Sequence, residues 1–112
     1  MGVVAVPRQG EVWLVNLDPT QGAEIRKTRP CLIVAPNEIN ESLETTIIAP
    51  MTTAIRSYPT RVGIRFQGKR GQVALDQIRT VDRRRLVRRL GTVSPTAAQD
   101  VLATLVEMFT RP

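Results

Sequence analysis

The sequence predicts an α+β domain: a small antiparallel barrel of about five short strands, a short basic helix and a C-terminal amphipathic helix. The chain has 112 residues, 42% of them hydrophobic, which suits a single domain over residues 1–112 with one core. Short β-rich runs separated by turn residues fill the first part of the chain. Apolar residues at helical spacing follow near the C-terminus.

The expected strands are bounded by proline, glycine and polar residues. They cover residues 11–17, 31–35, 45–49, 61–66 and 72–78. Pro19 ends the first strand and Pro50 ends the third. A glycine-flanked turn at residues 67–71 joins the last two strands as a hairpin, and residues 79–81 continue the fifth after a bend. The polar segment 37–44 is a loop or a single helical turn.

Two helices are expected after these strands. Asp82 can cap a short helix over residues 83–90, with Gly91 as its stop. Ser94 followed by Pro95 is typical of the start of a second, longer helix. Its apolar residues repeat at helical spacing and are Ala98, Val101, Leu102, Leu105 and Phe109. This stripe should close the core against the sheet.

Charge and rare residue types restrict the classes of function. The net charge of +6 and the pI of 11.0 favour a polyanionic partner such as nucleic acid, although an ordinary basic domain has the same composition. The chain has no histidine and one cysteine, Cys31, which argues against a zinc site and excludes a histidine base and an intrachain disulfide. No apolar run approaches the ~18 residues of a membrane span. We therefore expect a cytoplasmic protein without a metal or cofactor.

The loop after the first strand concentrates charge. Its charged residues are Glu24, Arg26, Lys27 and Arg29. Arg29 precedes Pro30, which biases the backbone of Arg29 towards extended geometry. A guanidinium can hold two phosphate oxygens at once, and Glu24 could accept a proton or orient Arg29. A solvated charged loop is the plainer alternative.

Two polar pairs elsewhere are further candidates. Thr52 and Thr53 follow the third strand, where their hydroxyls can bind a phosphate oxygen or satisfy the backbone of a turn. Asp76 and Gln77 interrupt an apolar strand. They either face solvent or point into a cleft, where one of them reads a base edge.

The strongest basic run covers residues 83–89, where Arg83 and Arg84 are the first of several arginines. Such a run would attract RNA or an acidic protein segment. The alternative is a solvated helix face.

Short motifs along the chain, taken together, resemble those of a known family. In chain order they are Gly10-Glu11-Val12-Trp13, Leu17-Asp18-Pro19-Thr20, Gly22-Ala23-Glu24, Lys27-Thr28-Arg29-Pro30, Asn37 with Asn40, Pro50-Met51-Thr52-Thr53, Tyr58-Pro59, Asp76-Gln77-Ile78-Arg79-Thr80 and Arg85-Leu86. Each is weak alone, but their order and spacing are specific. They resemble the MazF/PemK family of toxin endoribonucleases over nearly the whole chain.

The resemblance implies an SH3-like barrel in a two-fold homodimer. It implies sequence-specific cleavage of single-stranded RNA without a metal, leaving a 2′,3′-cyclic phosphate and a 5′-hydroxyl. The family's catalytic arginine falls on Arg29, its catalytic threonine on Thr52 and the acid of its first loop on Glu24. A further acidic position near the RNA falls on Asp76. Ala74 stands where one branch of the family has arginine.

The expected chemistry starts from the substrate, because the ribose 2′-hydroxyl attacks its own phosphate. Arg29 and Thr52 can donate hydrogen bonds to the phosphate oxygens. We hypothesise that Arg29 stabilises charge and acts as the acid, while Glu24 acts as the base or orients Arg29. The residues expected to bind RNA are Lys27, Thr53, Asp76, Gln77, Arg83 and Arg84.

The main hypothesis is thus a toxin with a cognate MazE-like antitoxin, whose acidic, partly disordered segment folds over the basic RNA groove. Two alternatives remain: a non-enzymatic toxin of the same barrel type that binds a protein such as gyrase, and a plain RNA-binding barrel. Arg29-Pro30 and Thr52 count against the gyrase-binding alternative, because that family lacks both.

Overall fold

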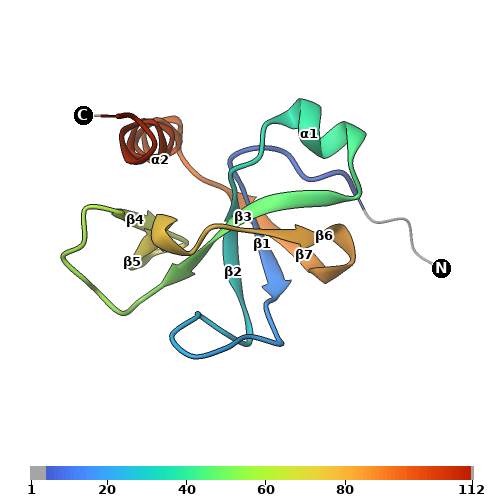
Figure 1. The fold of residues 1–112 in the computed structure, drawn as a ribbon, viewed down its shortest axis with the longest axis horizontal. Helices are drawn as coiled ribbons and strands as arrows, with labels where there is room; N and C mark the ends of the chain where they lie inside the picture. Colours follow the sequence, from blue (N-terminus) through green and yellow to red (C-terminus); the bar gives the residue numbers. More distant parts are fainter. Residues whose placement is uncertain (1–4, 112) are drawn as a thin grey trace.

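A curled antiparallel sheet, flanked by one long helix, forms the fold in a computed structural model that describes residues 5–111 (Figure 1). The elements are β1 (Glu11–Asn16), β2 (Thr28–Ile33), α1 (Asn37–Ser42), β3 (Thr45–Thr52), β4 (Arg61–Phe66), β5 (Lys69–Ala74), η1 (Leu75–Gln77), β6 (Arg79–Asp82), η2 (Arg83–Arg85), β7 (Leu86–Thr92) and α2 (Pro95–Met108). The strand order is β4-β5-β3-β2-β1-β7, with β6 paired to β3. Residues 1–4 and 112 of the predicted domain lie outside the described residues.

Two apolar clusters pack on the two faces of the central strands. Alternation along β1 and β2 sends Val12 and Leu32 into one cluster and Val15 and Cys31 into the other. Helix α2 adds Val101 to the first cluster and closes it, as its apolar stripe predicts. The central strands are therefore buried on both faces, which explains why their sequences alternate only in part.

Local sequence signals placed three features correctly. Ser94 caps α2 by accepting a hydrogen bond from the backbone N–H of Ala97, and Pro95 is its first residue. The β4–β5 hairpin turns at Gln67 and Gly68, which have φ angles of 51° and 79°. The expected helical turn after β2 is α1.

The α+β class is confirmed, but the sheet has seven strands rather than about five. Strand β3 runs through Pro50 to Thr52. Strand β5 ends at Ala74, so Asp76 and Gln77 lie in the 3₁₀ turn η1 and not on a strand. The next segment does not extend β5 but forms β6, which pairs with β3.

The predicted basic helix over residues 83–90 is wrong. Only the 3₁₀ turn η2 forms, and Leu86 then begins strand β7, which pairs with β1. Leu86 and Leu90, whose spacing of four residues suggested one helical face, pack in different clusters because the pairing of β7 with β1 shifts register between them. The edge of β1 offers a ladder of backbone hydrogen bonds to this segment, so the tertiary context decides in favour of the strand.

Candidate active site

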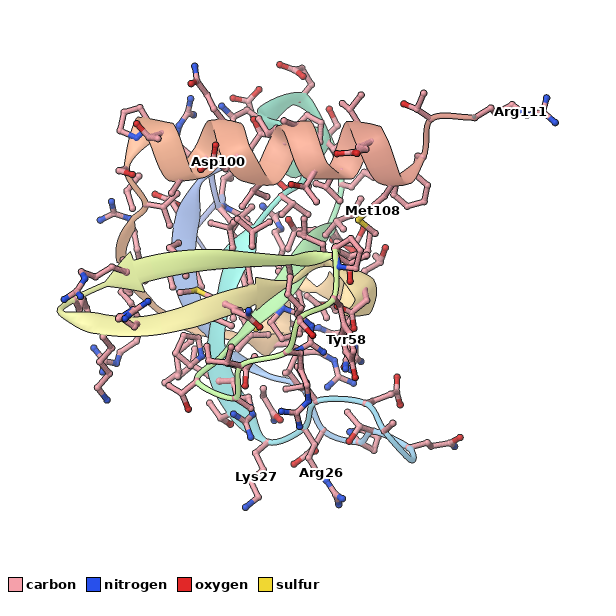
Figure 2. The ribbon with its side chains drawn as sticks, turned by 90° about the vertical axis from the view of Figure 1, so that its left-hand side faces the viewer. Arg26, Lys27, Tyr58, Asp100, Met108 and Arg111 are labelled. Carbon is pink, nitrogen blue, oxygen red and sulfur yellow. The ribbon has the colours of Figure 1, made fainter. Side chains whose placement is uncertain are left out.

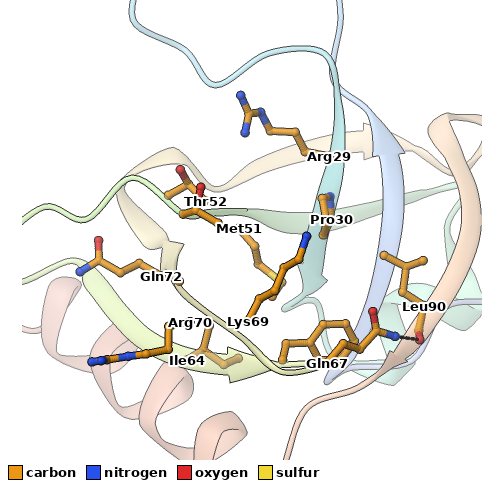
Figure 3. A pocket seen from close by; sticks show the side chains of 13 residues that line it. Arg29, Pro30, Met51, Thr52, Ile64, Gln67, Lys69, Arg70, Gln72 and Leu90 are labelled. Carbon is orange, nitrogen blue, oxygen red and sulfur yellow. Dashed lines mark hydrogen bonds between the residues drawn. The ribbon is translucent and has the colours of Figure 1, made fainter.

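Arg29 and Thr52 come together across neighbouring strands. Arg29 lies inside β2 rather than in the preceding loop, and Thr52 is the last residue of β3. Cys31 lies opposite Pro50, so two further residues along each antiparallel strand bring Arg29 opposite Thr52. Both line one pocket of roughly 290 Å³, and Figure 3 shows their side chains facing the same space.

The opposite wall of this pocket is the β4–β5 hairpin. Its apolar part comes from Ile64 and Phe66, and its cationic part from Lys69 and Arg70. The side-chain amide of Gln67 donates to the carbonyl oxygen of Leu90 at 2.9 Å, which ties the hairpin to β7. The pocket therefore offers positive charge to an anion beside an apolar surface for a base or a sugar.

Arg29 and Thr52 each keep hydrogen-bond donors for a ligand, although each also makes one hydrogen bond within the chain. The Nε of Arg29 donates to the carbonyl oxygen of Arg26 at 2.9 Å, which fixes the direction of the side chain. Within residues 5–111, Arg29 forms no ion pair. The hydroxyl oxygen of Thr52 accepts a hydrogen bond from the backbone N–H of Ala54 at 3.1 Å, so its proton remains available for donation.

Glu24 lies in a neighbouring pocket. Its Oε1 accepts a hydrogen bond from the backbone N–H of Gln21 at 2.6 Å. With Asp76, Gln77 and Arg79, it lines a space of roughly 380 Å³ that does not include Arg29 or Thr52. The side chain of Arg29 is thus held by a backbone carbonyl, and the role predicted for Glu24 stays a prediction.

Asp76 is held by Arg61. The Arg61 guanidinium donates to both carboxylate oxygens, at 2.7 and 3.1 Å, and the Thr60 hydroxyl adds a bond of 3.0 Å. The hydrogen bonds from Arg61 are the main reason that the pKa of Asp76 lies below its usual value. Arg61 also lies 5.1 Å from the centre of the Tyr58 ring. The Asp76 carboxylate is therefore charged and largely satisfied within the chain.

Gln77 tethers the first loop. Its Oε1 accepts from the backbone N–H of Ile25 at 2.6 Å, and its Nε2 donates to the carbonyl oxygen of Ala23 at 3.4 Å. These two bonds reach across more than fifty residues of sequence. The structure thus gives Gln77 a positioning role for the loop that carries Glu24, which the sequence did not indicate.

The remaining predicted RNA contacts are dispersed. Lys27 projects from the first loop, away from α2 (Figure 2). Arg83 and Arg84 follow β6, which pairs with the start of β3, whereas Thr52 ends β3 about 23 Å further along an extended strand. Arg84 forms an ion pair with Asp82. Within one chain, these two arginines are therefore not brought to the Arg29–Thr52 pocket, whereas Thr53 lines it.

Two cations of the pocket, Lys69 and Arg70, were not predicted. They lie at the start of β5, where the sequence indicated only a turn. The alternation of basic and apolar residues in β4 was an available signal for Arg70, which lies opposite Arg65, but not for Lys69, which lies opposite Phe66. Among the described residues, no group of three or more acids, histidines or cysteines is arranged to hold a metal ion, and no helix is long and apolar enough to cross a membrane.

Comparison with known proteins identifies the family. The model for PemK-like, MazF-like toxins of type II toxin–antitoxin systems matches residues 8–109. The chain belongs to this family. It is 38% identical over 111 residues to Endoribonuclease PemK of Escherichia coli, covering 91% of this chain and 81% of that protein. It is 31% identical to Endoribonuclease toxin MazF of Escherichia coli K12, covering 89% and 91%.

Solved structures of this family have the same fold. MazF from Deinococcus radiodurans superposes with a TM-score of 0.82 at 26% identity, over 93% of this chain and 96% of that one. A mycobacterial endoribonuclease solved with its cognate antitoxin gives a TM-score of 0.79 at 26% identity, over 95% and 99%. The family and the endoribonuclease class expected from the sequence motifs are confirmed by these relatives.

Proposed function

We propose that this chain is a cytoplasmic toxin that cleaves single-stranded RNA, including mRNA, at specific sequences and thereby inhibits translation. One observation carries the proposal: Arg29 and Thr52, from adjacent strands, line one pocket with unengaged hydrogen-bond donors. Lys69 and Arg70 add positive charge to its opposite wall. A phosphodiester fits these groups better than a neutral ligand does.

In the proposed reaction, the ribose 2′-oxygen attacks the adjacent phosphorus while the bond from phosphorus to the 5′-oxygen breaks. The products are a 2′,3′-cyclic phosphate and a 5′-hydroxyl. Arg29 and Thr52 donate to the phosphate oxygens and stabilise the charge that develops there. Arg29 delivers a proton to the leaving 5′-oxygen. Glu24, from the neighbouring pocket, takes the proton of the 2′-hydroxyl; in the alternative in which Glu24 orients Arg29, solvent water takes that proton. No step requires a metal.

The proposed RNA contacts beyond the reacting atoms share a polar or cationic side chain. They are Lys27, Thr53, Asp76, Gln77, Arg83 and Arg84. In a homodimer, the partner chain would extend this surface. We further propose that a MazE-like antitoxin covers it with an acidic segment that folds on binding. The mycobacterial relative solved with its cognate antitoxin supports this partner.

The deciding experiment incubates the purified protein with a long single-stranded RNA in EDTA and maps the new ends. We expect cleavage at a few sites, cyclic phosphate and 5′-hydroxyl ends, and no cleavage of DNA, which lacks the 2′-hydroxyl. Intact RNA under all conditions would refute the enzymatic proposal, and binding without cleavage would indicate a plain RNA-binding barrel.

Variants then assign the residues. Arg29→Ala and Thr52→Val should each lower kcat at least a hundredfold without loss of folding. Arg8→Ala is the matched control, because it removes one exposed arginine beside the start of β1, whereas Arg29 pairs with Val15 near its end. Glu24→Gln should remove the acidic limb of the pH–rate profile if Glu24 is the base. An unchanged profile would leave it only an orienting role.

A further inference from the structure

A second pocket adjoins the Arg29–Thr52 pocket on the β4–β5 hairpin. It has a volume of roughly 610 Å³ and lies between the hairpin and the β3–β4 loop. The two pockets share lining residues, which are Thr53, Ile64, Arg70, Gly71 and Gln72. The second pocket therefore lies directly beside the first, along the same hairpin.

Two arginines face each other in this second pocket. Arg65 on β4 lies opposite Arg70 on β5 in the hairpin register, so both side chains are on one face. Both are exposed, and within residues 5–111 neither forms an ion pair. Two like charges held opposite each other repel, and an anion between them would remove that cost.

The β3–β4 loop is fastened over this face. The side chain of Gln72, which is buried, accepts from the backbone N–H of Arg56 at 3.0 Å and donates to its carbonyl oxygen at 2.9 Å. The loop thereby holds Ile55 at the edge of the pocket, although 62% of Ile55 is exposed to solvent. A fixed loop with an exposed apolar side chain is suited to contact with the flat face of a base.

We infer that this groove binds the nucleotide that adjoins the scissile phosphate, with its own phosphate between Arg65 and Arg70 and its base against Ile55. The inference rests on the proposed function, because it takes the Arg29–Thr52 pocket as the place of cleavage. RNA is favoured over an acidic protein segment because the groove adjoins the reaction pocket and places a pair of cations beside an apolar contact, which fits the phosphate and the base of a nucleotide.

The kinetic test uses a short single-stranded RNA with one mapped cleavage site. Arg65→Ala should raise KM about tenfold and leave kcat within about twofold, because Arg65 lies outside the reaction pocket and its contact does not change in the transition state. Arg70→Ala, which also alters the reaction pocket, should raise KM by at least as much. Each should lower the slope of log affinity against log salt by about 0.7. Arg8→Ala, the matched control, should change neither. Kinetics and salt slopes equal to those of Arg8→Ala would overturn the inference.

A binding test identifies the phosphate and does not depend on cleavage. The RNA carries a 2′-deoxy nucleotide at the cleavage site, and single phosphates are replaced by uncharged methylphosphonates. For one methylphosphonate beside the cleavage site, the wild type and Arg65→Ala should bind the RNA equally tightly. The modified RNA already lacks the phosphate charge that Arg65 contacts, so removing Arg65 costs no further affinity. If Arg65→Ala binds more weakly than the wild type wherever the methylphosphonate is placed, the inference is overturned. Failure of the wild type to cleave any RNA would instead refute the proposed function.

Discussion

Replacing Gly71 by alanine places a methyl group against the backbone that carries Thr52. A Cβ atom built at Gly71 lies 2.7 Å from the carbonyl oxygen of Thr52, about 0.7 Å short of the 3.4 Å at which ordinary contact begins. The neighbour is backbone and cannot rotate away. Strands β3 and β5 pair at this point, with Thr52 opposite Gln72, so the end of β3 must move by several tenths of an ångström.

Two effects of this displacement can be separated. Overpacking of this kind costs about 1–3 kcal/mol, which lowers Tm by roughly 5–10 °C for a chain of this size. Thr52 moves relative to Arg29, which stays on β2, and a misplacement near 1 Å can cost about a hundredfold in rate. We therefore expect Gly71→Ala to lower kcat about tenfold to a hundredfold while the protein remains folded.

The assay combines thermal unfolding with single-turnover cleavage of an RNA that contains one site. Val101→Ala is the matched control for stability, because Val101 is the residue of α2 that is buried in the first cluster, and it does not line the pocket. It should lose about 2 kcal/mol of stability and keep its kcat. Wild-type kcat in Gly71→Ala, or an equal fall of kcat in Val101→Ala, would refute the reasoning.

Three further predictions concern groups outside the reaction pocket. Burial raises the pKa of the Cys31 thiol to about 12, although nearby arginines act to lower it. At pH 8 the native protein should therefore react with iodoacetamide far more slowly than the unfolded protein, and equal rates would contradict this. Hydrogen bonds from Arg61 lower the pKa of Asp76 in the folded protein. The interaction between Arg61 and Asp76 therefore stabilises the fold fully above the ordinary carboxyl pKa, and this stabilisation is lost as the pH falls through the lowered pKa of Asp76. Asp76→Asn should therefore cost about 1 kcal/mol at pH 7 in urea unfolding, after allowance for solvent screening, and the difference should shrink in acid. Buried Asn40 accepts a hydrogen bond from the Thr46 hydroxyl at 2.6 Å, so Asn40→Ala should cost about 2–3 kcal/mol, with cleavage unaffected below Tm.

Elements with local signals were predictable from the sequence. Ser94 and Pro95 set the start of α2, because a side-chain cap and a fixed φ act within one turn of the chain. The turn at Gln67 and Gly68 likewise fixed the β4–β5 hairpin. Family motifs singled out Arg29 and Thr52 from the other charged and hydroxyl residues, which residue spacing alone did not do.

Other features depended on partners far away in the sequence. Residues 86–92 become a strand because the edge of β1 is available to pair with them, and that edge exists only in the folded sheet. The meeting of Arg29 with Thr52 depends on the register of β2 against β3. The close approach of Gly71 to Thr52 and the facing arginines of the hairpin likewise follow from strand pairing.

The sequence by itself therefore determined the helix start, the hairpin turn, the basic charge and, through its motifs, the family and the candidate residues. Tertiary structure alone decided the strand count, the separation of Glu24 from the Arg29–Thr52 pocket, and the groove beside that pocket. The physical reason is the range of the interactions. Caps and turns act over a few residues, whereas strand pairing sets distances between side chains that the chain order leaves open.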